Sequence, residues 1–222
     1  MKIKTLSTEL VASQVELAFE AFPVQSVKTG LLCSSTMVRA IAKALIQFAL
    51  VRNVPIVVDP VMLASIGNSL VKGAISSAYL KELIPLATLL TPNLDELGVF
   101  AGETISTYTE MGKIGRKLSK EWKIPLLLKG GHLRGKIARD LLVMPTGDEV
   151  EYKSPFYSDV TTHGTGCTFS AAIAAHLALG CPLAQAVGIA KDYMDLVVRY
   201  HLTWGRTQTL EHFPNRKPKR ME

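Results

Sequence analysis

Cysteine is scarce in this chain of 222 residues, which contains only Cys33, Cys167 and Cys181. Three scattered cysteines cannot build the disulfide framework of a small secreted domain, and they form no CxxC pair that would indicate a zinc site. This scarcity excludes those two classes of protein and favours a reducing compartment. We therefore expect a cytoplasmic protein.

Long apolar runs are also absent. The longest, such as residues 126–128, are far shorter than a membrane span, so we expect no membrane partner. Lysine and arginine number 25 against 19 aspartates and glutamates, but part of this excess lies in a C-terminal run of Arg216, Lys217, Lys219 and Arg220. A basic run of this kind is usually solvated, so we predict a basic tail over about residues 205–222 and no nucleic-acid partner.

The chain does contain enough apolar sequence for a core, because hydrophobic residues make up 48% and charged residues 20%. Short apolar runs predict strands at 26–32, 54–58, 88–91 and 124–129, and a hairpin over 141–152. Apolar spacing of three and four residues predicts helices at 7–22, 34–51, 71–86, 95–101, 107–122, 166–179 and 183–202. This alternation is typical of βαβ crossovers, so the sequence predicts one α/β domain over 1–222 with a largely parallel sheet covered on both faces.

Polar and small residues follow the predicted strands, where open α/β sheets bind their ligands. Gly30 and Asp59 follow the first two strands, and Lys129 ends the fourth, before two glycines that would let a ligand approach the backbone. Lys129 suits a phosphate contact, although a surface lysine at a strand exit fits the same local sequence.

Asn93 and Glu96 follow the third strand, three residues apart at a helix start. Their oxygens could hold Mg²⁺ through water, with Asp59 adding negative charge nearby. The same two residues could equally form a helix-capping box, and Asp59 before Pro60 could be a turn former. The local sequence leaves both interpretations open.

A glycine-rich turn, Gly164-Thr165-Gly166, leads directly into Cys167 and an alanine-rich helix. Backbone N–H groups at such a helix start, with the helix dipole behind them, stabilise an anion. Cys167 lies in the first turn, where the dipole favours the thiolate, so it could act as a base or nucleophile. The alternative is a small buried apolar residue, which is what we expect of the other two cysteines.

An anion-binding helix start, a strand-end lysine and nearby carboxylates together indicate phosphoryl transfer, in which catalysis is mainly positioning and charge neutralisation. The chain has no GxxxxGKS/T motif, so it is not a P-loop enzyme. We expect His132 and His163 to be polar loop residues, because nothing pairs with them at metal-ligand spacing. A weaker alternative is a cysteine-dependent hydrolase or acyltransferase that pairs Cys167 with His163.

Four stretches carry a family resemblance: VVDPVM at 57–62, TPNLDE at 91–96, LKGGH at 128–132 and THGTGCT at 162–168. In order and spacing they resemble the hydroxymethylpyrimidine/phosphomethylpyrimidine kinase of thiamine biosynthesis, a ribokinase-superfamily enzyme, and the likeness runs from about residue 7 to residue 200. Most of the superfamily has aspartate where this chain has Cys167. That difference points to the pyrimidine kinase rather than to sugar kinases or most pyridoxal kinases.

The resemblance implies a three-layer αβα ribokinase-like fold and ATP- and Mg²⁺-dependent phosphorylation of 4-amino-5-hydroxymethyl-2-methylpyrimidine, then of its monophosphate to the diphosphate. It implies that Cys167 takes the proton of the attacking hydroxyl, while the backbone from Gly164 to Cys167 neutralises the transferring phosphoryl group. The other implied roles are ATP contacts for Lys129, Thr165 and Lys191, Mg²⁺ contacts for Asp59, Asn93 and Glu96, and pyrimidine contacts for Gly30 and Val61. The implied partners are the small pyrimidine and ATP, and the resemblance allows a homodimer.

The chain departs from the family pattern in three places. Family members begin with a further segment that carries the first strand and substrate-contacting residues, so we expect N-terminal strands, and with them half of the substrate pocket, to be missing. Leu32 stands where the family has methionine, and residues 64–68 read ASIGN where the family has an AKSGD-like loop. The alternatives are a non-catalytic remnant that binds only nucleotide or phosphate, and a pyridoxal-type kinase of the same superfamily.

Overall fold

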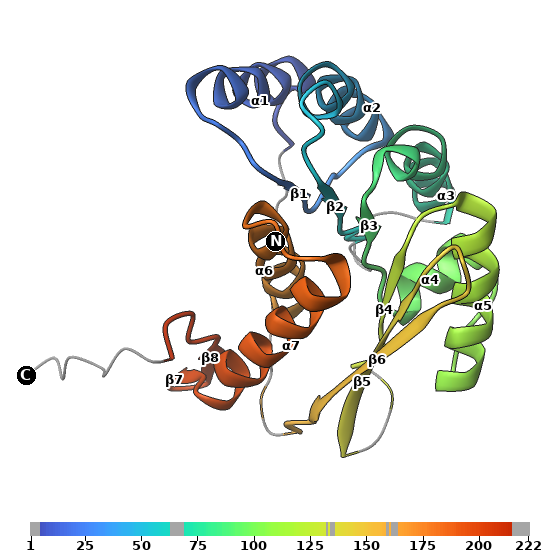
Figure 1. Cartoon of the computed structure of the whole chain (residues 1–222), viewed down its shortest axis with the longest axis vertical. Coiled ribbons are helices and arrows are strands. Elements are labelled where there is room, and N and C mark those ends of the chain that lie inside the picture. The colour runs from blue at the N-terminus through green and yellow to red at the C-terminus, as the bar shows by residue number, and fades with distance from the viewer. Residues whose placement is uncertain are drawn as a thin grey trace, which may run out of the picture.

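The computed structural model of the chain describes residues 5–62, 69–131, 133, 136–158, 160 and 164–214 (Figure 1). Several features of the sequence analysis lie outside these residues: the ASIGN loop at 64–68, His132, His163 and the basic run at 216–220. None of the helices in the described ranges is long and apolar enough to cross a membrane.

A six-stranded sheet in the order β1-β2-β3-β4-β5-β6 forms the centre of the fold. Its strands are β1 (Val27–Thr29), β2 (Ile56–Val58), β3 (Leu89–Leu90), β4 (Leu126–Lys129), β5 (Ile137–Val143) and β6 (Glu149–Pro155). The first four run parallel, and the β5–β6 hairpin joins β4 in antiparallel pairing. This confirms the predicted mostly parallel sheet, and the hairpin is longer than expected because its pairing extends out to Ile137 and Pro155.

Helices connect and cover these strands. They are α1 (Thr8–Ala21), α2 (Ser35–Leu45), α3 (Ser69–Ala78), α4 (Leu94–Ala101), α5 (Tyr108–Trp122), α6 (Thr165–Ala178) and α7 (Leu183–Arg199). A π-helical turn, η1 (Ile46–Leu50), extends α2, and η2 (Tyr79–Leu83) and η3 (Ile84–Leu86) extend α3. The side chains of Ser7, Ser34, Asn93 and Thr107 cap the starts of α1, α2, α4 and α5, which explains where those helices begin.

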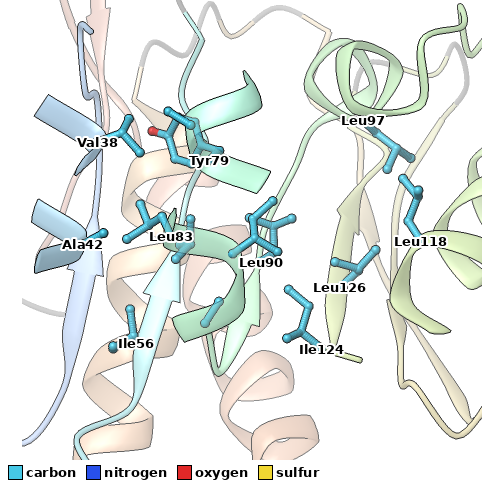
Figure 2. Packing of buried hydrophobic residues seen from close by; sticks show 14 of the residues in the cluster. Val38, Ala42, Ile56, Tyr79, Leu83, Leu90, Leu97, Leu118, Ile124 and Leu126 are labelled. Atoms are coloured by element: carbon cyan, nitrogen blue, oxygen red, sulfur yellow. The ribbon is translucent and has the colours of Figure 1, made fainter. Parts of the chain in front are cut away.

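The helices form two layers, one on each face of the sheet. Alternate strand residues such as Ile56 and Leu126 belong to a core shared with α1, α2, α4 and α5, in which Val38, Ala42 and Leu83 also pack (Figure 2). Their neighbours Val57 and Leu127 belong to a second core with α6 and α7, which lie together on the other side of the sheet (Figure 1). Strand residues buried on both faces are typical of a parallel sheet between helices, so the predicted three-layer αβα fold is confirmed.

The segment after α7 differs from the predicted basic tail. Strands β7 (Leu202–Trp204) and β8 (Thr207–Thr209) pair as an antiparallel hairpin, in the region where the sequence analysis expected α7 to end and a solvated tail to follow. Leu210 is buried in the core of α6 and α7. Burial of this apolar side chain holds the segment against the domain, which the net charge of the tail did not reveal.

Candidate active site

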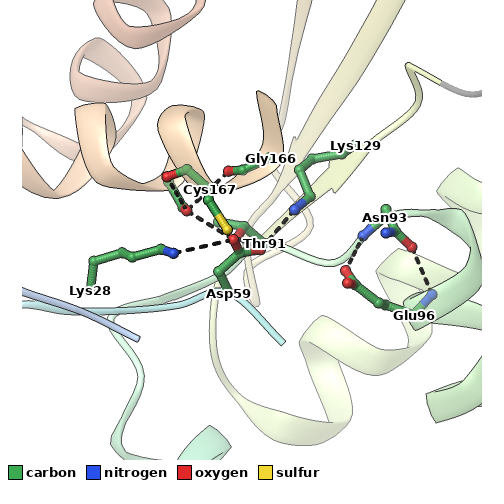
Figure 3. Close-up of polar contacts among 9 residues, drawn as sticks. Lys28, Asp59, Thr91, Asn93, Glu96, Lys129, Gly166 and Cys167 are labelled. Carbon is green, nitrogen blue, oxygen red and sulfur yellow. Dashed lines mark hydrogen bonds and ion pairs between the residues drawn. The ribbon is translucent and has the colours of Figure 1, made fainter. Parts of the chain in front are cut away.

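Asp59 is the centre of the candidate site. It follows β2, and its side chain is fully buried at the carboxyl ends of the parallel strands, beside the start of α6 (Figure 3). Lys129 Nζ donates a hydrogen bond to Asp59 Oδ1 at 2.8 Å, and the Thr91 hydroxyl donates to the same oxygen at 3.2 Å. Ser170 Oγ donates to Oδ2 at 3.0 Å, and Lys28 Nζ lies 3.6 Å from that oxygen. One carboxylate therefore connects β1, β4 and α6.

The ionisation of Asp59 follows from this environment. Burial alone would raise the pKa of its carboxyl, but the charges of Lys129 and Lys28 and the hydrogen bonds from Lys129 and Ser170 outweigh burial and hold the pKa below its ordinary value. Asp59 therefore remains a carboxylate. It can fix two ammonium groups in place, and it is poorly suited to accept a proton.

Lys129 lies between this carboxylate and the first turn of α6. It is the last residue of β4, and its amide donates to the Pro92 carbonyl at 2.9 Å, which aligns the ends of neighbouring strands. A Cβ atom built on Gly166 would lie only 3.1 Å from Lys129 Nζ. The absence of a side chain at Gly166 thus leaves the room that the ammonium group occupies.

The start of α6 presents backbone donors to the same place. Gly164 precedes the helix in a left-handed conformation, with φ of 91°, and provides no side chain to cap it. The first N–H groups of a helix have no partner within the helix, so those of Thr165, Gly166 and Cys167 can serve an anion, and the helix dipole adds to that attraction.

Cys167 is a half-buried free thiol in this first turn. In Figure 3 its side chain points from α6 toward the end of the sheet that carries Asp59 and Thr91. Cys33 and Cys181 are also half-buried rather than buried, and Cys181 packs against the core of α6 and α7.

Asn93 and Glu96 form a capping box at the start of α4, which confirms one of the two interpretations of this pair. The Asn93 amide donates to Glu96 Oε2, and the Glu96 amide donates to Asn93 Oδ1, both at 2.8 Å (Figure 3). Burial raises the pKa of Glu96 to about 7, although Lys129 and the backbone hydrogen bonds oppose that shift. Because both side chains cap the helix, they would contact Mg²⁺ best through water and nucleotide oxygens.

Direct metal ligation by protein side chains alone has little support. In the part of the chain that the structure describes, no three histidine, cysteine, aspartate or glutamate side chains gather closely enough to hold a metal ion. The nearby carboxylate of Asp59 is already engaged by Lys129 and by two hydroxyl groups.

Lys191, for which the resemblance implies an ATP contact, takes part in a buried ion pair. This α7 residue is buried, and its Nζ donates to Asp140 Oδ2 at 2.6 Å. The other oxygen of Asp140 accepts a hydrogen bond of 3.0 Å from the Gly130 amide, beside Lys129. Asp140 therefore links α7 to the glycine turn that follows β4.

A cleft of about 530 Å³ opens between the β5–β6 hairpin, α6 and α7. Its lining includes five of the predicted site residues, namely Asn93, Lys129, Thr165, Gly166 and Lys191. The side chains of Phe169, Tyr157 and Met194 add apolar surface. This combination of apolar wall, lysine and helix start suits a ligand with a flat apolar part and phosphate groups.

Gly30 and Val61 lie at the ends of β1 and β2. The Val61 amide donates to the Asp59 carbonyl at 2.8 Å, and the Cβ position of Gly30 is 3.1 Å from Lys28 Nζ. Both predicted substrate contacts therefore adjoin the Asp59 cluster.

Sequence reasoning missed four polar residues of this region: Lys28, Thr91, Ser170 and Asp140. Thr91 could have been found, because it ends the third predicted strand just before the Asn93 pair. Ser170 could have been found as well, since it follows Gly166 by one helical turn and so shares its face.

Comparison with known proteins places the chain in a family. A family model described as phosphomethylpyrimidine kinase matches residues 1–212. The hydroxymethylpyrimidine/phosphomethylpyrimidine kinase of Rhizobium meliloti is 37% identical over 198 residues, which are 88% of this chain and 72% of that protein. The thiamine biosynthesis bifunctional protein ThiED of Geobacter sulfurreducens is 39% identical over 196 residues. These residues are 88% of this chain but only 39% of that longer protein.

Solved structures agree with the sequence matches. The phosphomethylpyrimidine kinase of Clostridium difficile superposes with a TM-score of 0.70 at 33% identity, covering 87% of this chain and 78% of that one. The ADP complex of Bacillus subtilis pyridoxal kinase superposes with a TM-score of 0.86 at 25% identity, covering 96% and 80%. Solved structures of both pyridoxal kinase and phosphomethylpyrimidine kinase resemble this chain. The family model and the two relatives above are named for phosphomethylpyrimidine kinase or thiamine biosynthesis, and they favour that family over pyridoxal kinase. On these matches, the chain belongs to the phosphomethylpyrimidine kinase family.

Proposed function

We propose that the chain is an ATP-dependent phosphotransferase of thiamine biosynthesis. It phosphorylates the hydroxymethyl group of 4-amino-5-hydroxymethyl-2-methylpyrimidine and then converts the monophosphate to the diphosphate. One observation carries the proposal: Lys129 Nζ is held by Asp59 at 2.8 Å, next to the first turn of α6, where a lysine and backbone N–H groups converge on one point. Such convergence suits a transferring phosphoryl group.

ATP occupies the cleft of about 530 Å³ beside α6 and α7 in this proposal. Lys129 and Thr165 line the cleft on the phosphate side. Lys191, paired with Asp140, lies in its wall. Staphylococcus aureus pyridoxal kinase, whose fold matches with a TM-score of 0.84 at 25% identity, has been solved with AMP-PCP and pyridoxal, which supports nucleotide use in this fold.

The first reaction needs a base and an anion site. The acceptor hydroxyl oxygen attacks the γ-phosphorus, the bond from that phosphorus to ADP breaks, and Cys167 takes the hydroxyl proton as a thiolate. The backbone N–H groups from Gly164 to Cys167 stabilise the charge on the transferring group, and Lys129 stabilises charge on the nucleotide side. The products are the phosphomonoester, ADP and a protonated Cys167.

Mg²⁺ fits this site through water. Asn93 lines the cleft beside Lys129, and the oxygens of Asn93, Glu96 and Asp59 already make hydrogen bonds within the protein. When bound, the ion would supply charge neutralisation to the nucleotide phosphates. These residues would hold its water ligands rather than the ion itself.

The acceptor lies at the ends of β1 and β2 in this proposal. Gly30 and Val61 adjoin Asp59 there, across from the nucleotide cleft. The hydroxymethyl group would then point toward Cys167. A cytoplasmic location, a single domain over 1–222, a homodimer and the absence of a nucleic-acid partner stay predictions.

Pyridoxal is the second candidate acceptor, because the pyridoxal complex of the S. aureus pyridoxal kinase superposes with a TM-score of 0.83 at 26% identity. Coupled measurement of ADP release, with Mg²⁺ and either hydroxymethylpyrimidine or pyridoxal, separates the two. We expect faster release with the pyrimidine and its loss in Cys167→Ala. Faster release with pyridoxal would favour the second candidate, and ATP binding without release would favour the non-catalytic remnant.

The cysteine-dependent hydrolase is a further alternative. It needs His163 beside Cys167, and that histidine lies outside the described residues. Inactivation by iodoacetamide distinguishes it, since ATP would protect Cys167 of a kinase and an acyl substrate would protect that of a hydrolase.

A further inference from the structure

Lys28 is the charged residue of the Asp59 cluster to which the proposed first reaction gives no role. It is the second residue of β1, and its register partner across the sheet is Val57 of β2. Val57 packs against the α6 and α7 layer, so Lys28 lies on the face that carries the start of α6. Its side chain is 17% exposed, which is low for a lysine.

The ammonium group of Lys28 lies on the acceptor side of Asp59. Its Nζ is 3.6 Å from Asp59 Oδ2. It is also 3.1 Å from the point where a Cβ atom built on Gly30 would lie. Figure 3 shows Lys28 and Lys129 approaching Asp59 from opposite sides. Lys129 lines the nucleotide cleft, so the two lysines flank the point where donor and acceptor would meet.

The charges of this cluster do not balance. Asp59 supplies one negative charge, and Lys129 already neutralises it with a hydrogen bond of 2.8 Å. Thr91 and Ser170 satisfy the same carboxylate with their hydroxyl groups. Within the described residues, Lys28 is paired with no carboxylate other than Asp59. A second, poorly solvated ammonium group is costly unless an anion joins it.

We propose that Lys28 binds the phosphate of the acceptor in the second reaction, in which the monophosphate becomes the diphosphate. This inference rests on the proposed function. The first acceptor is a neutral alcohol, whereas the second is a phosphate monoester that carries negative charge into a site next to the phosphates of ATP. Lys28 offsets that charge on the acceptor side, as Lys129 does on the nucleotide side.

The second reaction places different demands on the site. An oxygen of the acceptor phosphate attacks the γ-phosphorus of ATP, the bond from that phosphorus to ADP breaks, and the products are the diphosphate and ADP. The attacking oxygen is already deprotonated, so this step needs no base. It needs the repulsion between two phosphate groups to be offset, which is the role that a cation between Gly30 and Asp59 fits.

The test compares the two acceptors in Lys28→Met, in Lys28→Arg and in Lys113→Met, which removes an exposed lysine of α5 as a matched control. ADP release gives kcat/KM for hydroxymethylpyrimidine and for its monophosphate separately. We expect Lys28→Met to lower the monophosphate value about 10- to 100-fold more than the alcohol value, since a hydrogen bond to a charged group is lost. In Lys28→Arg the ratio of the two kcat/KM values should stay close to that of the wild type, because arginine keeps the positive charge. In Lys113→Met the ratio should equal the wild-type ratio.

Calorimetric binding of the monophosphate to the whole chain provides a readout independent of turnover. The expected result is a weaker Kd in Lys28→Met and a Kd close to wild type in Lys113→Met. Equal loss for both acceptors, or an unchanged monophosphate Kd, would overturn the proposal and leave Lys28 as a counter-ion of Asp59. Wild-type protein that binds the monophosphate but releases no ADP would contradict the proposed function, while the binding comparison would still decide the role of Lys28.

Discussion

Lys191 and Asp140, 51 residues apart in the sequence, form a buried ion pair of 2.6 Å in the wall of the nucleotide cleft. The same carboxylate accepts a hydrogen bond from the Gly130 amide. Asp140 thus ties α7 to the glycine turn that follows Lys129. We expect this buried ion pair to fix the geometry of the cleft wall more than it adds stability, because desolvation of the two charges offsets their attraction.

Removing one partner of this pair should be costly. Asp140→Asn leaves the Lys191 charge buried without a counter-charge, so we expect the free energy of unfolding to fall by about 3–5 kcal/mol. The double variant Asp140→Leu/Lys191→Met should recover most of that loss, while calorimetry should find weaker ATP binding. Urea denaturation measures both stabilities, and a double variant no more stable than Asp140→Asn would contradict the interpretation.

Cys167→Ala should separate the two reactions in the opposite sense to Lys28→Met. The alcohol must lose a proton, whereas the monophosphate oxygen has none to lose. We expect the rate of the first reaction to fall about 100-fold or more, and that of the second to fall much less. ADP release with each acceptor measures both rates, and Cys181→Ala, in the turn between α6 and α7, provides the matched cysteine control. Equal losses in the two reactions would argue against a base at Cys167.

Gly166→Ala tests the room that Lys129 requires. The new Cβ would lie 3.1 Å from Lys129 Nζ, so the ammonium group must shift by a few tenths of an ångström. We expect kcat/KM for ATP to fall about tenfold, because small displacements at a phosphoryl-transfer site are costly. Gly188→Ala is the control, since its Cβ meets only the Tyr152 ring at 3.5 Å and lies in α7. Full activity in Gly166→Ala would show that the close approach has no functional role.

Glu151 gives the fold a predictable response to acid. Its carboxylate accepts a hydrogen bond from Arg139 at 2.7 Å and pairs with Lys153 at 2.6 Å. The hydrogen bond that Lys153 donates is the main reason that the pKa of Glu151 falls to about 2 from the ordinary 4.5. The native state then binds fewer protons than the unfolded state, so this stabilisation is complete above about pH 4.5 and is lost as pH falls toward 2. The pair is partly solvated, so we expect Glu151→Gln to cost only about 1 kcal/mol at pH 7. Thermal unfolding at several pH values should show that difference shrinking in acid, and a difference that grows would be contrary to expectation.

The sequence predicted most of the fold because the relevant signals are local. Short apolar runs identified all four parallel strands, and the polar or small residues at their ends, such as Asp59, Asn93 and Lys129, indicated where the strands stop. The capping box of Asn93 and Glu96 was visible as well, since both partners lie within one helical turn. Local spacing alone could not decide between that cap and a metal site.

The contacts that define the site are long-range, and no local pattern encodes them. Lys129 meets Asp59 across 70 residues, and Ser170 meets it across 111. These contacts depend on how the crossover helices pack. Asp140 was hidden for a related reason, because a charged residue inside an apolar strand gives no hint of the lysine that will neutralise it.

Phosphorus NMR of the whole chain with ATP, Mg²⁺ and hydroxymethylpyrimidine tests the central claim most directly, since it follows the transferred group itself. The claim predicts a phosphomonoester signal, then a diphosphate signal, each matched by ADP, with the first signal strongly delayed in Cys167→Ala. Conversion of ATP only to ADP and inorganic phosphate, or binding of ATP with no new phosphoester, would contradict it.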